Sequence, residues 1–181
     1  MPTGFARRAY FDAHDSSVGE LAGLIATVTP VGRYPLAAGI EREVVVYDAA
    51  RFETAAADAA GRTALMAELA EVLRDGPGVI LVRGAIPVDV VERTRAVLEA
   101  ILDEQRSTSN ATGDHFAMAG TNDRIWNALE KLAVASPGCF VDYYSSASIA
   151  LASEAWLGPG YQITSQINIV NPGGVAQSPH R

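Results

Sequence analysis

The sequence predicts an α+β fold in which helices are followed by strands. Hydrophobic residues make up 49% and charged residues 19% of the 181 residues, a balance that favours a helix-rich globular protein over a disordered one. Apolar residues recur at helical spacing in several segments before residue 158, whereas from Tyr161 they alternate with polar residues as in a strand. The length fits a single domain spanning residues 1–181.

Residues 1–74 are expected to form an N-terminal arm with helices and a strand. A short helix is expected in "SVGELAGLIA", and a segment punctuated by proline and glycine follows it. The β-branched run in "REVVVYD" predicts a strand. The stretch "RTALMAELAEVLRDGPG" predicts an amphipathic helix that ends at Gly76-Pro77-Gly78. The inward face of this helix would consist of Leu65, Leu69, Val72 and Leu73.

A strand-turn-helix unit is expected over residues 78–105. The apolar run Val79 to Val82 is brief and bounded by glycines, which suits a buried strand, and Pro87 then opens a helix. Its inward stripe would be Val90, Val91, Thr94, Val97, Leu98 and Ile101. Such a unit also occurs in nucleotide-binding enzymes, but the turn at Gly84 lacks the glycine patterns that cradle phosphates.

Two further helices and a strand are expected in the remainder. One helix would be capped by Thr121, Asn122 or Asp123 and would bury Ile125, Leu129 and Leu132. "SPGCFVDYY" is interpreted as a connector, and "SSASIALASEAWLG" as a helix ended by Gly158-Pro159-Gly160. In "YQITSQINIVNPGG" the polar face of the strand would carry Gln162, Thr164, Gln166 and Asn168. Alternation alone is typical of an ordinary antiparallel strand with one face in solvent.

Charge and cysteine content exclude several classes of protein. The net charge of −7 and the absence of a Lys/Arg run argue against nucleic acid or an anionic membrane as the main partner, which leaves small molecules or other proteins. A single cysteine, Cys139, cannot form an internal disulfide. Neither a signal peptide nor a membrane anchor is recognisable, so a cytoplasmic location is expected. The oligomeric state is not indicated.

The three histidines differ in what surrounds them. His14 lies between acids near the N-terminus, where solvated polar residues are common. His115, in "TGDHFAMAG", lies on a glycine-flanked loop, where it could contact a substrate or bond locally. His180, in "AQSPHR", would by position alone belong to a terminal tail. A histidine two residues before a carboxylate is nevertheless part of the facial triad that holds Fe(II) in oxygenases.

From about Asp75 onward the chain resembles the phytanoyl-CoA dioxygenase family of non-haem Fe(II), 2-oxoglutarate-dependent oxygenases. The matching segments are "GPGVILVRGAIPVDVVERTRAVLEAI", "WLGPGYQITSQINIVNPGG" and "QSPHR". The last of these resembles the start of the family's His-x-Asp motif. The family-like region covers residues 75–181, and the resemblance implies that strands of a double-stranded β-helix barrel, of the jelly-roll or cupin type, begin at about residue 161.

The resemblance also implies a site and a reaction. Position by position, it implies His180 as the first iron ligand, Thr164, Gln166 and Asn168 as contacts to 2-oxoglutarate, and His115, Phe116 and Trp126 as substrate contacts. The implied cofactors are Fe(II), the co-substrate 2-oxoglutarate and O2, with ascorbate as a stimulant. The implied activity is hydroxylation of a small organic molecule, coupled to decarboxylation of 2-oxoglutarate to succinate.

Other parts of the family's site would follow His180 and are missing from these 181 residues. They are the carboxylate ligand, the second histidine, a basic residue for 2-oxoglutarate and most barrel strands. We therefore interpret the chain as the N-terminal part of a dioxygenase, with a barrel incomplete at its C-terminus. The 181-residue chain alone is expected to be inactive. The alternative is a non-catalytic binding or assembly module derived from such an oxygenase.

Overall fold

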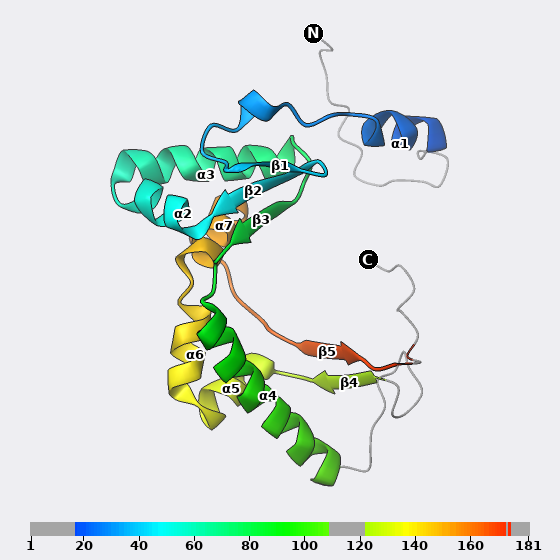
Figure 1. The fold of residues 1–181 in the computed structure, drawn as a ribbon, viewed down its shortest axis with the longest axis vertical. Helices are drawn as coiled ribbons and strands as arrows, with labels where there is room; N and C mark the ends of the chain where they lie inside the picture. The colour runs from blue at the N-terminus through cyan, green and yellow to red at the C-terminus, as the bar shows by residue number, and fades with distance from the viewer. Residues whose placement is uncertain (1–16, 109–121, 173, 175–181) are drawn as a thin grey trace.

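A computed structural model describes residues 17–108, 122–172 and 174 of the chain. The described residues form a mixed α+β structure with two groups of elements, which we call the upper and lower lobes (Figure 1). The expected α+β class is therefore confirmed at this level. The described residues form no closed barrel. Within the same ranges, no helix combines the length and the apolar character needed to cross a membrane.

The upper lobe is built on a three-stranded sheet in the order β1-β2-β3. The pairing of β1 with β2 is antiparallel and that of β2 with β3 is parallel. Its strands are β1 (Gly39–Glu41), β2 (Val44–Asp48) and β3 (Ile80–Arg83), and its helices are α2 (Ala49–Ala56), α3 (Ala59–Arg74) and α7 (Ala147–Leu157). Before the sheet come α1 (Val18–Ile25) and the 3-10 turn η2 (Val31–Arg33).

The core of the upper lobe lies between the sheet and the helices. Val45, Val46 and Tyr47 of β2 are buried, and the ring of Tyr47 meets that of Phe52 edge-on with centroids 5.2 Å apart. The buried Glu68 accepts hydrogen bonds from the Tyr47 hydroxyl at 3.0 Å and from the Leu36 N–H at 3.1 Å, so its carboxylate is satisfied. The buried apolar members are Tyr34, Val45, Tyr47, Phe52, Leu65, Leu69, Val72 and Leu151.

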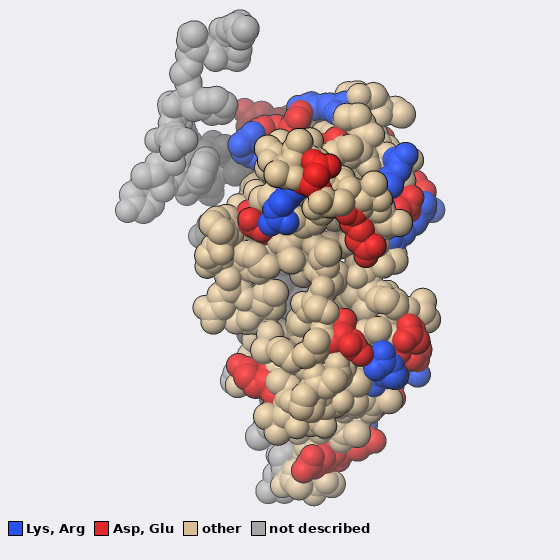
Figure 2. Space-filling view, turned by 90° about the vertical axis from the view of Figure 1, so that its left-hand side faces the viewer, with Lys and Arg blue, Asp and Glu red and all other residues tan. Residues whose placement is uncertain are grey.

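The lower lobe combines three helices that pack on one another with a two-stranded antiparallel ribbon. Its elements are α4 (Val88–Thr108), β4 (Asn122–Ile125), α5 (Ala128–Ala135), α6 (Pro137–Tyr144) and β5 (Ile167–Val170). A separate, smaller core forms where Ile125 and Ala128 meet Leu102 of α4. The lobes are joined by a hydrogen bond from the Ser146 hydroxyl to the Ala85 carbonyl at 2.7 Å. Acidic and basic side chains are interspersed on one face, and uncharged residues fill its middle (Figure 2).

Several sequence predictions are confirmed by this structure. Helices form at α1, α3 and α7, a strand at β2, and a strand-turn-helix unit at β3 and α4. Gly84 in that unit has a φ of 70° and Gly158, which follows α7, has a φ of 83°, both in the region that glycine adopts most readily. On the predicted face of α3, Leu65, Leu69 and Val72 are buried and Leu73 is half-buried.

Other predictions need correction. Asn122 and Asp123 do not cap a helix, because residues 122–125 pair with β5 as a strand and the helix begins only at Ala128. The expected connector "SPGCFVDYY" is helix α6, with Pro137 in its first turn. The strand expected from Tyr161 is limited to Ile167–Val170.

Two expected burial patterns also differ from the structure. The run Val79 to Val82 is not buried on both sides, because Ile80 and Val82 are half-buried whereas Val79 and Leu81, on the other face, remain about half exposed. On α4, Val91 is exposed, so the inward stripe of that helix is narrower than expected. Val90 and Thr94 of the stripe are buried, and Val97, Leu98 and Ile101 are half-buried.

Candidate functional site

The candidate site is the outer face of the β4–β5 ribbon. Ile125 lies opposite Ile167, and Arg124 lies opposite Asn168. Because side chains alternate along a strand, the isoleucine pair points to one face and the arginine–asparagine pair to the other. The isoleucines pack with Leu102 of α4, which identifies their face as the inner one. The outer face therefore brings a guanidinium and an amide side by side.

The polar residues predicted for co-substrate binding lie at and before β5. Asn168 lies within the strand and is exposed, which agrees with its predicted position on a polar strand face. Thr164 and Gln166 are also exposed, but both precede the strand. The described residues thus place one of the three on a regular strand face and leave all three accessible to a ligand.

The aromatic candidate Trp126 extends the outer face beyond β4. Its side chain is 44% exposed, and the guanidinium carbon of Arg124 lies 4.6 Å from the centre of its ring. This cation–π contact holds the guanidinium over the indole. The remaining candidates, His115, Phe116 and His180, lie outside the described residues.

Sequence reasoning missed Arg124 and its neighbour Asn122 on the same face. Asn122 is only 8% exposed, and its Oδ1 has no hydrogen-bond partner among the residues that the structure describes. A buried amide oxygen without a donor is uncommon and marks a place where a donor can be accommodated. No local signal marks this strand, because four polar or charged residues in a row precede Ile125 and resemble a helix cap.

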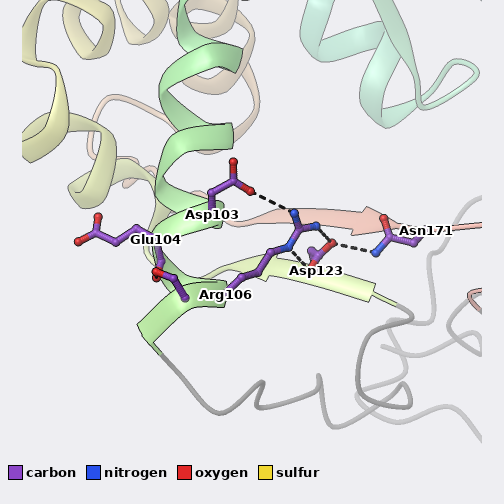
Figure 3. A network of polar contacts seen from close by, with 6 residues as sticks. Asp103, Glu104, Arg106, Asp123 and Asn171 are labelled. Carbon is purple, nitrogen blue, oxygen red and sulfur yellow. Dashed lines mark hydrogen bonds and ion pairs between the residues drawn. The ribbon is translucent and has the colours of Figure 1, made fainter.

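A polar network on the inner side fixes the end of the ribbon (Figure 3). Arg106 of α4 donates to both carboxylate oxygens of Asp123, with Nε at 3.2 Å from Oδ1, and also to Asp103 at 3.2 Å. Asn171 donates from Nδ2 to Asp123 Oδ2 at 2.8 Å. The carbonyl of Asn171 accepts the N–H of Gly174 at 2.8 Å, so a turn begins where the network ends.

Asp123 is the electrostatic centre of this network. The hydrogen bonds from Arg106 and then from Asn171 lower the pKa of its carboxyl below the ordinary value, because both donors stabilise the charged form. Its side chain is 14% exposed, which limits the screening of these contacts by solvent. Asp123 is therefore a carboxylate that stays ionised and joins α4, β4 and the residue after β5.

A site for Fe(II) requires several ligating side chains that converge on one point. The described residues contain no group of three His, Cys, Asp or Glu side chains positioned to hold an ion. Asp123 is occupied by Arg106 and Asn171, and the single cysteine, Cys139, is half-buried in α6. Three facial ligands for Fe(II) are thus not supplied by the described part of the chain.

Comparison with known proteins gives no match. No protein-family model matches the sequence, and neither a curated protein nor a solved structure is significantly similar to it.

Proposed function

We propose that the chain is the N-terminal part of an Fe(II)- and 2-oxoglutarate-dependent oxygenase of the phytanoyl-CoA dioxygenase kind, which hydroxylates a small organic molecule. One observation of the structure carries the proposal: the outer face of the β4–β5 ribbon places Arg124 directly opposite Asn168. The residue resemblance from Asp75 onward supports the same assignment. In the complete protein, we propose, further strands continue this ribbon into a barrel.

The paired side chains have the chemistry that a carboxylate needs. Residues directly opposite each other in an antiparallel ribbon have Cβ atoms about 4.5 to 5.5 Å apart, so both side chains reach one ligand group. A guanidinium binds a carboxylate through two parallel hydrogen bonds, and the Asn168 amide adds another donor. The indole of Trp126 limits where the guanidinium can turn. Arg124 and Asn168 would thus bind one carboxylate of 2-oxoglutarate.

The iron of the proposed enzyme would be held by residues outside the described ranges. His180 is the proposed first ligand, and we propose that the two others follow it in the complete protein. Since the described residues do not provide the ligand set, the 181-residue chain is expected to bind 2-oxoglutarate weakly and to turn none of it over. When bound, Fe(II) would supply the activation of O2, with ascorbate keeping it reduced.

A binding experiment tests the part of the site that is present. Titration of 2-oxoglutarate into the 181-residue chain, followed by NMR of the amides of residues 122–126 and 166–170, should show saturable shifts. Arg124→Gln should weaken binding by roughly tenfold or more, since a charged hydrogen bond is lost. Arg95→Gln is the matched control, because Arg95 is an exposed arginine of α4 whose ion-pair partners lie on the same helix. Equal affinity of both variants would refute the site.

An activity experiment tests the reaction. The protein translated from a reading frame extended beyond Arg181 should release succinate from 2-oxoglutarate in the presence of Fe(II), O2 and ascorbate. The substitution His180→Ala should abolish this release. The control His14→Ala makes the same change at a histidine distant from His180 in the sequence and should leave succinate release unchanged. Succinate release by the 181-residue chain above its own His180→Ala variant would contradict the expected inactivity of the chain alone.

The second candidate, a non-catalytic binding or assembly module, is favoured by a different observation. Helix α1 exposes large apolar side chains and buries none. A chain that fails to bind 2-oxoglutarate but associates through this helix would support the module over the oxygenase.

A further inference from the structure

Helix α1 is an apolar element without a partner among the described residues. None of its eight residues is buried, and Figure 1 shows it standing away from the upper lobe. A helix this short is not stable alone in water, because its few hydrogen bonds do not compensate for the cost of the first turn. The large apolar residues of α1 and of the segment after it that remain exposed are Val18 (85%), Leu21 (57%), Leu24 (72%), Ile25 (75%), Val28 (71%) and Val31 (80%).

A groove lies beside this helix. It has a volume of about 500 Å³, and one wall consists of Leu24, Ile25 and Val28. The opposite wall consists of Tyr34 with the turn at Gly76 and Pro77. A side chain at Gly76 would come within 2.5 Å of the Tyr34 hydroxyl, so glycine is what allows this wall to close around the tyrosine. The apolar side chains of the helix thus continue into the groove, whose lining also includes the charged residues Arg33, Glu43 and Asp75.

The segment after α1 is fixed to the sheet rather than loose. Thr29 is buried, its N–H donates to Glu43 Oε2 at 2.5 Å, and its hydroxyl donates to the Glu43 carbonyl at 3.2 Å. Glu43 and Arg42 form the β1–β2 turn, with φ of 68° and 51°. Non-glycine residues adopt this conformation only when their surroundings hold them there. The groove is therefore a preformed feature, with α1 attached along its edge.

We propose that this surface is the interface of a two-fold symmetric homodimer, in which α1 of each copy lies against α1 of the other and fills the other's groove. A two-fold interface is self-complementary, so a helix and an adjacent groove on one chain satisfy each other in two copies. The inference holds whether or not the chain binds 2-oxoglutarate.

The area of the surface agrees with a dimer. A valine, leucine or isoleucine side chain carries on the order of 60 to 120 Å² of apolar surface. With the exposed fractions of the six residues, each copy offers roughly 250 to 500 Å² of apolar surface, and in the dimer this surface covers its counterpart on the other copy. Both copies together would bury roughly 500 to 1,000 Å² through these side chains, which is the size of a weak, concentration-dependent interface.

The charges near the surface favour a second copy over other partners. The only charged residue of α1 is Glu20, so the helix lacks the lysines and arginines with which surface helices bind anionic lipids. Arg33 lines the groove and its side chain is 42% exposed. Arg33 already pairs with Glu71 at 2.8 Å, so Glu43 and Asp75 leave the groove acidic, which disfavours an anionic partner and suits the nearly uncharged α1 of a second copy.

The mass of the purified chain in solution tests the proposal. Sedimentation velocity across the micromolar range should give twice the chain mass of 19.1 kDa. Leu24→Glu should weaken the dimer by roughly tenfold or more, because it places a charge in the centre of the interface. Val134→Glu is the control, since Val134 is an apolar residue of α5 with 85% exposure outside this surface, and it should leave the mass unchanged.

A cross-linking experiment covers the case in which Leu24→Glu disturbs the fold. In a Cys139→Ser background, Leu21→Cys should give a disulfide-linked dimer on mild oxidation, whereas Val134→Cys should stay monomeric. A wild-type chain of 19.1 kDa at every concentration would overturn the proposal. Equal dissociation by the two glutamate variants, or open-ended assemblies larger than a dimer, would overturn it as well.

Discussion

At the residue scale, Asp123 connects three parts of the lower lobe: α4, β4 and the residue that follows β5. Its carboxylate receives hydrogen bonds from Arg106 on α4 and from Asn171 after β5, while its backbone pairs with Ile169. Ion pairs on an open surface contribute little, but this carboxylate is mostly buried and accepts from two donors at once. The network therefore fixes β4 and β5 to α4 on the side opposite Arg124.

Asp123→Asn should destabilise the fold at neutral pH by about 1 kcal/mol, because it removes a charge-assisted contact with Arg106. The folded state lowers the pKa of this carboxyl from its ordinary 3.8. Its contribution is thus fully present above that value and is lost as the pH falls through the lower pKa of the folded state. The stability difference between wild type and variant, measured by urea unfolding, should shrink below about pH 4.

Asp103→Asn is the control for this prediction. Asp103 contacts the same arginine at 3.2 Å, but its side chain is 74% exposed, so its loss should change stability by less than about 0.5 kcal/mol. A pH-independent difference between wild type and Asp123→Asn would contradict the assigned role.

At the scale of elements, the helices were easier to predict than the ribbon. Helices α3, α4 and α7 are visible in the sequence because their apolar spacing is local. Asn122 and Asp123 were wrongly expected to cap a helix that would bury Ile125, since Asn and Asp favour cap positions and the true partner of this segment, β5, lies more than 40 residues away. The same non-local pairing is what brings Arg124 beside Asn168, so half of the candidate site could not be found from a window of sequence.

Asn127 marks the boundary at which the chain leaves β4 and enters α5. It has φ of 52° and ψ of 46°, the left-handed conformation that asparagine tolerates better than most residues. Asn127→Ala should therefore cost about 1 kcal/mol in urea unfolding, while Asn127→Gly should be neutral or slightly stabilising. If alanine and glycine destabilised the fold equally, a side-chain contact of Asn127 rather than its backbone would be responsible.

At the scale of the whole molecule, two separate hydrophobic cores stabilise the fold. The upper core contains Leu69 and the lower core contains Ile125, and the two clusters share no residue. Cores of this kind open as separate cooperative units when the contacts between them are few. The sequence predicted one domain of 181 residues and gave no sign of two cores, because apolar spacing shows which face of a helix is buried but not what buries it.

Truncation within each core should therefore affect mainly its own lobe. Ile125→Ala should speed amide hydrogen exchange in β4, β5 and α4 and leave β2 and β3 nearly unchanged, and Leu69→Ala should do the reverse. Each loss of a buried aliphatic side chain should cost about 2 to 4 kcal/mol. Equal acceleration of exchange in both lobes by either variant would show that they unfold as one unit.

The elements of the lower lobe lie between elements of the upper lobe in the sequence, which has a consequence for synthesis on the ribosome. The upper core needs Leu151 of α7, and Arg62 of α3 pairs with Glu154 of the same helix, yet α4 to α6 are made between β3 and α7. At a synthesis rate of about 5 to 20 residues per second, roughly 3 to 13 s pass between the completion of β3 and the synthesis of α7. During that interval the faces of α2 and α3 that pack against α7 remain uncovered, and the lower lobe is completed later still, because its strand β5 follows α7 in the chain.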